Sequence, residues 1–278
     1  MKPLRIAILM HERDSPQSVG EYLVRLLVAE WHEDGHEVVF LFGTDTFIPA
    51  DVLVVHVDLS VVPQEYIDFA ARYPVTLNGR IRDIRKSTFS SQRLTRDSNW
   101  QGPVIVKTDA NFDGIPERLR GVGPAGSRPA AGPNASSRRT WRAGYVVYHS
   151  ADEVQEWVFN DPSLIVERFR PEVEEGFFCV RFLTCLGKQI SSARLKGSNP
   201  IVNGSSVRRI EEVKPHEEIV AVRERLGCDY GKLDYVLVDG EPILLDVNKT
   251  VGIGRGLISD QRLAGEVRRL ANGLYDYL

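Results

Sequence analysis

The chain has 278 residues, 42% hydrophobic and 26% charged, which is enough for a substantial core in one large domain or in two to three lobes. Its formal net charge of −3 carries no general signature of polyanion binding, so no nucleic-acid partner is expected. No apolar run has the length of a membrane span, and the three cysteines lack metal-site spacing. We therefore expect a cytoplasmic protein with reduced thiols and no membrane partner.

The N-terminal part of the sequence predicts alternating strands and helices. Strands are expected at 4–10, 38–42, 52–56 and 75–78, and helices at 17–34 and 63–72, the first ending at Gly35. This order indicates a parallel α/β layer. Polar residues at 11–14 and 78–80 follow strand ends, where open α/β sheets bind ligands. Two explanations of these polar residues stay open: they contact a substrate, or they are polar only because they lie in surface loops.

A strand is expected at 103–107, followed by a loop at 108–116 and then by the chain's one low-complexity segment, residues 118–142. This segment is rich in Gly, Pro, Ala and Ser and contains no acidic residue. Its six arginines are Arg118, Arg120, Arg128, Arg138, Arg139 and Arg142. Two interpretations stay open, a basic lid over an anionic ligand and a disordered surface insertion. Under the first, two or more of these arginines approach the ligand.

The second half of the chain predicts mostly antiparallel strands. A helix is expected at 151–160, a strand at 164–169, and a hairpin of 177–184 with 188–194 around Gly187. Helices follow at 216–227, ending at Gly227, and from Ser259 to about 276. Between these two helices, residues 232–248 read as a second hairpin.

The hairpin at 232–248 carries three hard oxygen ligands, Asp234, Asp246 and Asn248. Side-chain alternation places Asp246 and Asn248 on one face, roughly 6.6 Å apart. Such ligands suit Mg²⁺, which is usually held by one or two carboxylates together with substrate phosphates. The alternative is an ordinary half-buried hairpin with a solvated charged face.

The register of this hairpin depends on its loop. A two-residue Asp-Gly loop would set Asp234 opposite Leu245, whereas a three-residue loop, 239–241, sets Asp234 opposite Asp246. The longer loop leaves the other face apolar or aromatic and pairs two carboxylates that need a cation, so we predict it. Its other cross-strand pairs are Lys232/Asn248, Leu233/Val247, Tyr235/Leu245, Leu237/Ile243 and Val238/Pro242.

In these residues and their order the chain resembles the ATP-grasp superfamily, which includes D-alanine–D-alanine ligase, glutathione synthetase and the ribosomal-protein glutamate ligases. The resemblance covers about residues 75–256. The family's last metal-binding strands carry Asp, then about a dozen residues with a turn, then Glu-x-Asn and often Pro-Gly. Here Asp234, Asp246 and Asn248 match, but Asp246 replaces the usual Glu and Val251 replaces the usual Pro.

The resemblance implies an α/β protein with the ATP-grasp fold in three parts. An N-terminal parallel α/β domain, the pre-ATP-grasp domain, is expected at 1–86. A small ATP-grasp lobe at 87–164 would contain the segment 118–142 as a mobile basic loop over the phosphates. A C-terminal lobe at 165–278 would carry the metal hairpin.

The resemblance also implies a nucleotide site. Lys107 and the earlier lysine Lys86 would contact the ATP phosphates, and the strand of Glu167, Arg168 and Phe169 would meet the adenine. This strand corresponds to the family's hinge strand. The family segment that follows the hinge is matched by residues 178–183, which include Arg181, by residues 187–190 with Arg194, and by the loop at 203–204. The place of the usual ribose-binding acid is held by residues 178–179, so Glu174 or Glu175 would substitute. Asp234, Asp246 and Asn248 would hold one or two Mg²⁺ ions, with Mn²⁺ as an alternative.

The implied activity is an ATP- and Mg²⁺-dependent ligase that joins a carboxylate to an amine through an acyl phosphate, releasing ADP and phosphate. Lys232, Arg194 and Arg255 are the candidates for binding the carboxylate or the oxyanion. The substrates would be small carboxylates and amines, or a peptide. An ATP-grasp kinase, a catalytically degenerate nucleotide-binding protein and, for residues 1–60, a sugar-nucleotide glycosyltransferase stay open as alternatives, and so does a homodimer.

Overall fold

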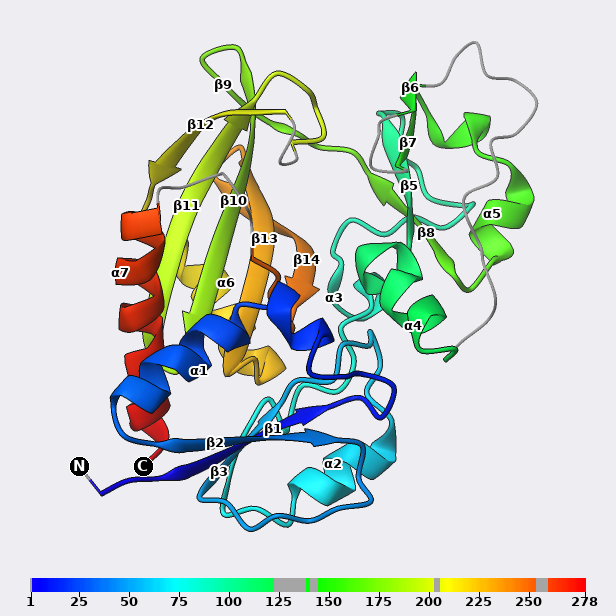
Figure 1. Cartoon of the computed structure of the whole chain (residues 1–278). Helices are drawn as coiled ribbons and strands as arrows, with labels where there is room; N and C mark the ends of the chain where they lie inside the picture. The colour runs from blue at the N-terminus through cyan, green and yellow to red at the C-terminus, as the bar shows by residue number, and fades with distance from the viewer. Residues whose placement is uncertain (1, 123–138, 141–144, 203–205, 254–259) are drawn as a thin grey trace.

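The computed structural model of the chain describes residues 2–122, 139–140, 145–202, 206–253 and 260–278. Strands within these ranges form three sheets (Figure 1). A four-stranded sheet lies at the bottom of the view, a six-stranded sheet lies above it on the left, and a second four-stranded sheet lies above it on the right. No helix among the described residues has the length and apolar character needed to cross a bilayer.

The N-terminal sheet is parallel throughout and has the strand order β2-β1-β3-β4. Its elements in chain order are β1 (Arg5–Met10), η1 (Ser18–Glu21), α1 (Val24–Glu33), β2 (Glu37–Phe42), β3 (Val52–Val55), α2 (Gln64–Ala70) and β4 (Val75–Leu77). Side chains alternate along β1, so Ile6 and Ile8 pack with α1 while Ala7 and Leu9 pack with α2. The predicted parallel α/β layer is therefore confirmed, with a helix on each face.

The helix predicted over 17–34 is interrupted after its first turn. Tyr22 has an extended backbone (φ −102°, ψ 146°), forms a bridge with Gly252 and donates a hydrogen bond from its hydroxyl to Asp58 (2.7 Å). These tertiary contacts hold the chain extended at this point, so α1 begins only at Val24. The helix is followed, as predicted, by Gly35 with a positive φ of 85°.

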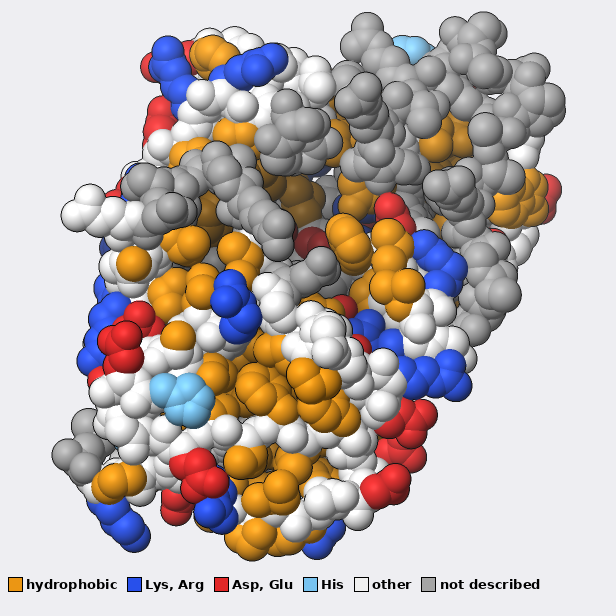
Figure 2. Space-filling model, viewed as in Figure 1, with side chains coloured by type: hydrophobic (Ala, Val, Ile, Leu, Met, Phe, Trp, Pro, Cys, Tyr) orange, Lys and Arg blue, Asp and Glu red, His pale blue; other side chains and the backbone are white. Residues whose placement is uncertain are grey.

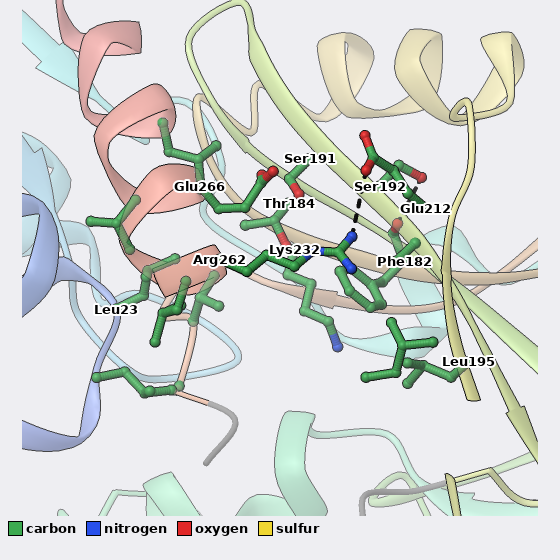
Figure 3. Close-up of a pocket in the computed structure, with 18 of the residues that line it drawn as sticks. Leu23, Phe182, Thr184, Ser191, Ser192, Leu195, Glu212, Lys232, Arg262 and Glu266 are labelled. Carbon is green, nitrogen blue, oxygen red and sulfur yellow. Dashed lines mark hydrogen bonds and ion pairs between the residues drawn. The ribbon is translucent and has the colours of Figure 1, made fainter. Parts of the chain in front are cut away.

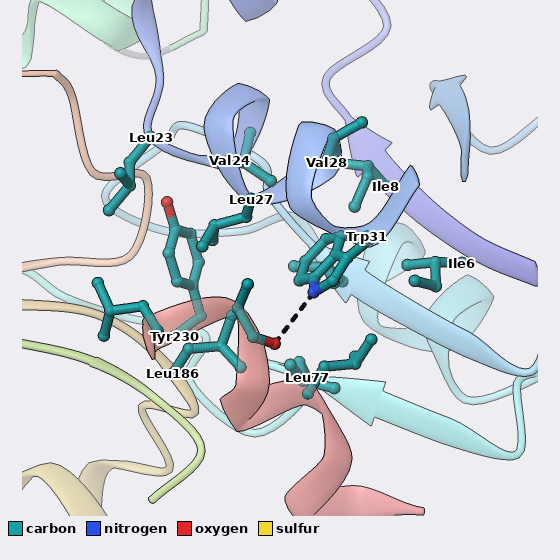
Figure 4. Close-up of a cluster of buried hydrophobic side chains, with 14 of the residues drawn as sticks. Ile6, Ile8, Leu23, Val24, Leu27, Val28, Trp31, Leu77, Leu186 and Tyr230 are labelled. Atoms are coloured by element: carbon teal, nitrogen blue, oxygen red, sulfur yellow. Dashed lines mark hydrogen bonds between the residues drawn. The ribbon is translucent and has the colours of Figure 1, made fainter. Parts of the chain in front are cut away.

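The core beneath α1 joins the N-terminal layer to the C-terminal end of the chain (Figure 4). Trp31 of α1 is fully buried, and its indole N–H donates to the carbonyl of Ala271 (3.1 Å). Leu186 and Tyr230, from the large sheet, belong to the same cluster. The last helix predicted to reach 276 ends earlier, because α7 (Asp260–Ala271) continues as the 3-10 helix η5 (Asn272–Tyr277), and Ser259 lies outside the described residues.

The small sheet is antiparallel and has the order β6-β7-β5-β8. The elements of this region are α3 (Lys86–Phe89), β5 (Val104–Thr108), η2 (Asn111–Gly114), α4 (Ile115–Leu119), β6 (Arg139–Thr140), β7 (Val146–Tyr148), η4 (Ala151–Glu153), α5 (Glu156–Asn160) and β8 (Leu164–Arg168). Short helices thus replace both the loop expected at 108–116 and the single helix expected at 151–160. Hydrogen bonds to β5 place β8 in this sheet, although the predicted boundary at 164–165 assigns it to the C-terminal lobe. That boundary stays a prediction.

The described residues include only part of the basic segment 118–142. Arg118 lies on the short helix α4, and its guanidinium donates a hydrogen bond to the carbonyl of Asp113 (2.6 Å). Arg120 is buried and forms ion pairs with Asp14 (2.7 Å) and Asp58 (3.5 Å), so it joins two parts of the fold and is not free to approach a ligand. The side chains of the other four arginines, Arg128, Arg138, Arg139 and Arg142, lie outside the described part of the chain.

The large sheet is antiparallel and has the order β12-β11-β10-β13-β14, with β9 paired to one end of β10. Its elements are β9 (Glu172–Glu174), β10 (Phe177–Leu186), β11 (Gln189–Gly197), β12 (Val207–Glu212), α6 (Glu217–Leu226), β13 (Tyr230–Val238) and β14 (Glu241–Asn248). Helix α6 covers one face of this sheet through Ile219, which packs on Leu233 and Tyr235. Helix α7 packs along β11 at the other side (Figure 1).

The hairpin of β13 and β14 corrects the predicted loop. Val238 pairs with Glu241, and Asp239 (φ 55°) and Gly240 (φ 82°) form a two-residue loop, because Asp-Gly accepts two successive left-handed residues at little cost. The three-residue loop was therefore wrong. Its carboxylate pair is nevertheless present, because a β-bulge at Leu245 shifts the register between Tyr235 and Asp234. The pairs of this hairpin are Lys232/Asn248, Leu233/Val247, Asp234/Asp246, Tyr235/Leu244, Val236/Ile243, Leu237/Pro242 and Val238/Glu241.

Candidate functional site

A cavity of about 330 Å³ lies between the small sheet and the large sheet, and we call it the intersheet cavity. The space-filling view shows its hollow between the two upper lobes, with hydrophobic and acidic side chains deep within it (Figure 2). Eight of the residues predicted or considered for the site line it, namely Lys86, Lys107, Glu167, Arg168, Phe169, Lys232, Asp234 and Asp246. Residues far apart in sequence therefore meet around one space.

Two buried lysines reach the intersheet cavity from the small-sheet side. Lys86, at the start of α3, is 2% exposed; its Nζ donates to the carbonyl of Ala110 (3.0 Å) and lies 3.5 Å from Oδ1 of Asp246. Lys107 on β5 forms an ion pair with Glu167 on β8, and both side chains are buried. Burial of an ammonium group is costly unless it is paired, and each of these lysines has an oxygen partner within the protein.

Two carboxylates reach the same cavity from the large sheet. Asp234 and Asp246 are cross-strand partners, and Lys232 lies 2.7 Å from Asp234. Burial raises the pKa of Asp234, Lys232 opposes that shift, and the neighbouring charge of Asp246 adds to it. Oδ1 of Asp246 is buried and accepts no hydrogen bond among the described residues. That oxygen still lies 3.5 Å from the ammonium of Lys86. Paired carboxylates with an oxygen that accepts no hydrogen bond fit a hard divalent cation such as Mg²⁺.

Asn248, the third predicted metal ligand, does not line the intersheet cavity with the other two. Its Oδ1 accepts hydrogen bonds from the backbone N–H (2.8 Å) and the hydroxyl (3.2 Å) of Thr250, and the residue lines a neighbouring cavity rather than the intersheet cavity. It lies opposite Lys232 across the hairpin. The metal site that the described contacts fit best therefore consists of Asp234 and Asp246, with Asn248 at its edge.

The intersheet cavity is also lined by apolar side chains that the sequence did not assign to the site, including Ile105, Val236 and Leu245. Gln92 also lines this cavity, and its Oε1 is buried without a hydrogen-bond partner in the described structure. Strand alternation could have found Ile105 and Val236, because each lies two residues from a predicted ligand, Lys107 or Asp234. No sequence pattern around Gln92 predicts that it lines the cavity, because it lies in a loop and not on a regular strand or helix.

Four other predicted residues do not line the intersheet cavity. Arg181 forms a two-pronged ion pair with Glu172 (2.8–3.0 Å). Arg194 pairs with both Glu174 and Glu211. Strand alternation explains Arg194, since Leu195 lines the cavity and its neighbour faces the other way.

Glu175 is likewise engaged, with the ammonium of Lys196 (2.9 Å). The residues proposed to replace a ribose-binding acid, Glu174 and Glu175, therefore belong to an ion-pair cluster of β9, β11 and β12. Arg255 and the loop at 203–204 lie outside the described residues.

The polar residues after β1 and β4 are held by contacts within the protein. Oδ1 of Asn78 accepts from the backbone N–H groups of Asp229 (2.9 Å) and Tyr230 (3.0 Å), and its Nδ2 donates to the carbonyl of Tyr230 (2.7 Å). His11 is buried, which is the main cause of its lowered pKa, and its Nδ1 accepts from the backbone of Arg13 (3.1 Å). These contacts engage Asn78 and His11 within the fold, and whether residues 11–14 and 78–80 contact a substrate stays open.

No model of a known protein family matches the sequence, and a search of curated proteins finds no match. Solved structures do match over nearly the whole chain. The VanG D-Ala:D-Ser ligase from Enterococcus faecalis has 12% identity, a TM-score of 0.57 and 100% coverage of both chains. A RiPP-associated ATP-grasp ligase from Chryseobacterium gregarium, in complex with ADP and a leader and core peptide, has 10% identity and a TM-score of 0.56, covering 99% of this chain and 97% of that one.

The D-alanine–D-alanine ligase from Bacillus anthracis, complexed with ATP, is similar with 14% identity and a TM-score of 0.51, covering 99% of this chain and 97% of that one. At these identities a structural match concerns the arrangement of the chain and not its chemistry. Together with the two upper sheets and the cavity between them, these likenesses show that the chain has the ATP-grasp fold.

Proposed function

We propose that this protein is an ATP- and Mg²⁺-dependent ligase that joins a carboxylate to an amine through an acyl phosphate, with release of ADP and phosphate. The observation that carries the proposal is the convergence of two buried lysines and two cross-strand carboxylates on one cavity between two sheets. Cations for phosphates and oxygen ligands for a metal are the two requirements of phosphoryl transfer. Structures similar to this chain are those of ATP-grasp ligases, two of them with ATP or ADP bound.

The nucleotide would lie along the intersheet cavity. Lys86 and Lys107 would exchange their present oxygen partners for phosphate oxygens, which are stronger partners because they carry more negative charge. Ile105, Val236 and other apolar side chains would contact the faces of the adenine, and Oε1 of Gln92 would accept from its amino group. The strand of Glu167, Arg168 and Phe169, which lines the same cavity, would lie beside the adenine. The backbone N–H of Phe169 donates to the carbonyl of Pro103 (2.8 Å), so this N–H is already engaged.

Asp234 and Asp246 would hold the Mg²⁺, with Asn248 at the edge, and Mn²⁺ accepts the same oxygen ligands. A bound ion would withdraw charge from the terminal phosphate and so make it a better electrophile. Lys232 would orient the substrate carboxylate, whose oxygen attacks the terminal phosphorus and displaces ADP. The amine then attacks the carbonyl carbon of the acyl phosphate, loses a proton and displaces inorganic phosphate.

Calorimetric titration of Mg²⁺-ADP into the wild type and Asp246→Ala tests the nucleotide site. We expect magnesium-dependent binding by the wild type that the substitution abolishes, with EDTA as a control for the metal. The exposed residue Asp45 offers a matched control, and Asp45→Ala should bind like the wild type. A folded wild type that binds no nucleotide would overturn the proposal.

The choice between ligase and kinase needs the product. In a ligase, ADP release requires both the acid and the amine, or is greatly accelerated by the amine, and the isolated product contains no phosphate. A kinase would instead accumulate a stable phosphorylated hydroxyl compound. Mass spectrometry of a reaction run with labelled ATP distinguishes the two.

A further inference from the structure

A second cavity, of about 310 Å³, lies beside the intersheet cavity, and we call it the α7 cavity (Figure 3). It is enclosed by helix α7, the strands β10 and β11, the end of β14 and the segment that precedes α1. Its apolar lining residues are Leu23, Phe182, Ala193, Leu195, Ile210, Val251, Ile253, Leu263, Val267 and Leu270. Of these residues, the sequence pattern of the nucleotide site included only Val251 and Phe182, and it gave neither a role in binding.

The apolar lining of the α7 cavity follows from the spacing of apolar residues along the helix and the strands that form its walls. Leu263, Val267 and Leu270 recur at helical spacing on α7, so they face the sheet together. Ala193 and Leu195 lie two residues apart on β11 and therefore share a face. The result is a concave apolar surface of the size that holds a small organic group.

Lys232 belongs to the walls of both cavities, and so does Leu195. The ammonium of Lys232 lies 2.7 Å from Asp234 on the intersheet side and 5.2 Å from the centre of the Phe182 ring on the other. A carboxylate bound to Lys232 would thus be next to the metal-binding pair. Whatever is attached to that carboxylate would extend into the α7 cavity.

Several polar residues that line the α7 cavity are paired within the protein. Arg262 pairs with Glu212 (3.5 Å), as the dashed line in Figure 3 shows, and Glu266 pairs with Arg269 (2.6 Å). The hydroxyl of Ser192 donates to the carbonyl of Phe182 (2.9 Å). An apolar tail would leave these contacts in place, lie against the apolar majority of the lining and displace only water.

We propose that the acid substrate is a hydrophobic carboxylic acid, with its carboxylate on Lys232 and its aliphatic or aromatic tail in the α7 cavity. This inference rests on the proposed ligase function, because it assigns the substrate class of that same site. The tail contributes binding energy away from the reacting atoms, which fixes the carboxylate against the terminal phosphate.

The test is calorimetric titration of a straight-chain series, propanoate to hexanoate, into the protein with and without saturating Mg²⁺-ADP. Burial of each added methylene should tighten binding about three- to fourfold. Leu263→Trp fills the cavity and should remove the dependence on chain length, while Mg²⁺-ADP affinity stays unchanged. Leu119→Trp, at an exposed position on α4, is the matched control and should bind the series like the wild type.

Two further variants and an amine ligand control for misfolding of the tryptophan variant and test the contact between Lys232 and the carboxylate. Leu263→Ala enlarges the cavity and should shift the best ligand to a longer chain, which supplies a readout if the tryptophan variant fails to fold. Lys232→Gln should weaken every member of the series by a similar factor, because it removes the contact to the carboxylate only. Hexylamine should bind more weakly than hexanoate.

Each other outcome overturns the inference. Equal affinity for propanoate and hexanoate, or tighter binding of succinate, would show that the α7 cavity does not receive an apolar tail. Preference for hexylamine would reverse the charge assigned to the head group. If Mg²⁺-ADP binds and no carboxylate does, the substrate class is wrong and the proposed nucleotide site survives. If Mg²⁺-ADP fails to bind, the proposed function fails, and the assignment of an acid substrate fails with it.

Discussion

Asp234 and Asp246 lie directly opposite each other across β13 and β14, and a single bulged residue, Leu245, brings them into that register. Like charges in this position destabilise a strand pair unless a cation lies between them. Lys232 pairs with Asp234 and Lys86 lies near Asp246, and a divalent ion would stabilise the two carboxylates further. Their pairing therefore supports the proposed metal site more strongly than either residue alone.

The affinity for Mg²⁺-ADP should fall in acid at a higher pH than an ordinary aspartate would cause. Burial is the main reason why the pKa of Asp234 is raised, and a protonated carboxyl group no longer binds Mg²⁺. Titrations across the acidic range, in two buffers of different ionisation enthalpy, measure the proton released on binding. ADP without metal is the control, and an affinity for Mg²⁺-ADP that does not change with pH would contradict the prediction.

Lys107→Met should lower the free energy of unfolding by about 3–5 kcal/mol, because it leaves the buried carboxylate of Glu167 without its partner. The double variant Lys107→Met/Glu167→Gln should recover most of that loss, since the remaining charge is removed. Neither variant should bind Mg²⁺-ADP tightly if Lys107 contacts phosphate. Urea unfolding measures the first two effects, and a double variant as unstable as the single one would refute the coupling.

His56→Phe should make the protein less sensitive to acid. Burial lowers the pKa of His56 from 6.5 to about 4, so the unfolded chain binds its proton more tightly than the folded protein. Stability should therefore be fully present above the unfolded value of 6.5 and fall as the pH drops toward 4, by about 3 kcal/mol from this group. Neither ring nitrogen has a hydrogen-bond partner among the described residues, so phenylalanine should be tolerated.

Urea unfolding as a function of pH checks this prediction. The variant's curve should be flatter than the wild-type curve in the window between those two pKa values. His149 is exposed, so His149→Phe is a matched control that should retain the wild-type pH dependence. Parallel curves for the wild type and His56→Phe would show that other groups cause the acid sensitivity.

Asn78→Ala should destabilise the protein by about 3 kcal/mol, because it leaves the buried backbone groups of Asp229 and Tyr230 without partners. The positive φ of Asn78 (59°) adds to the cost, since alanine adopts this conformation less readily. Thermal or urea unfolding measures the loss. Asn160→Ala removes one exposed hydrogen bond and should change stability by less than about 0.5 kcal/mol.

The sequence alone located most strands of the nucleotide region and the three hairpin pairs nearest its outer end, whereas the predicted pairs Tyr235/Leu245, Leu237/Ile243 and Val238/Pro242 were wrong. Hydrophobic periodicity is a local property of the chain, so it located the parallel N-terminal layer and the strand of Lys107. The requirement that one hairpin face be apolar set Asp234 opposite Asp246. Sequence could not say where the extra residue lies, because a longer loop and a bulge satisfy the same face requirement.

Only the tertiary structure decided which charged residues remain available to a ligand. Arg181 and Arg194 were expected at the ligand site, and Arg120 was one of six arginines of which two or more were expected there if their segment is a lid. Each of the three is paired with carboxylates from other strands or loops. Ion pairing depends on distances between segments remote in sequence, which no local period encodes. For the same reason the α7 cavity, whose walls come from both ends of the chain, could be recognised only after Leu23 and Leu263 were placed side by side by folding.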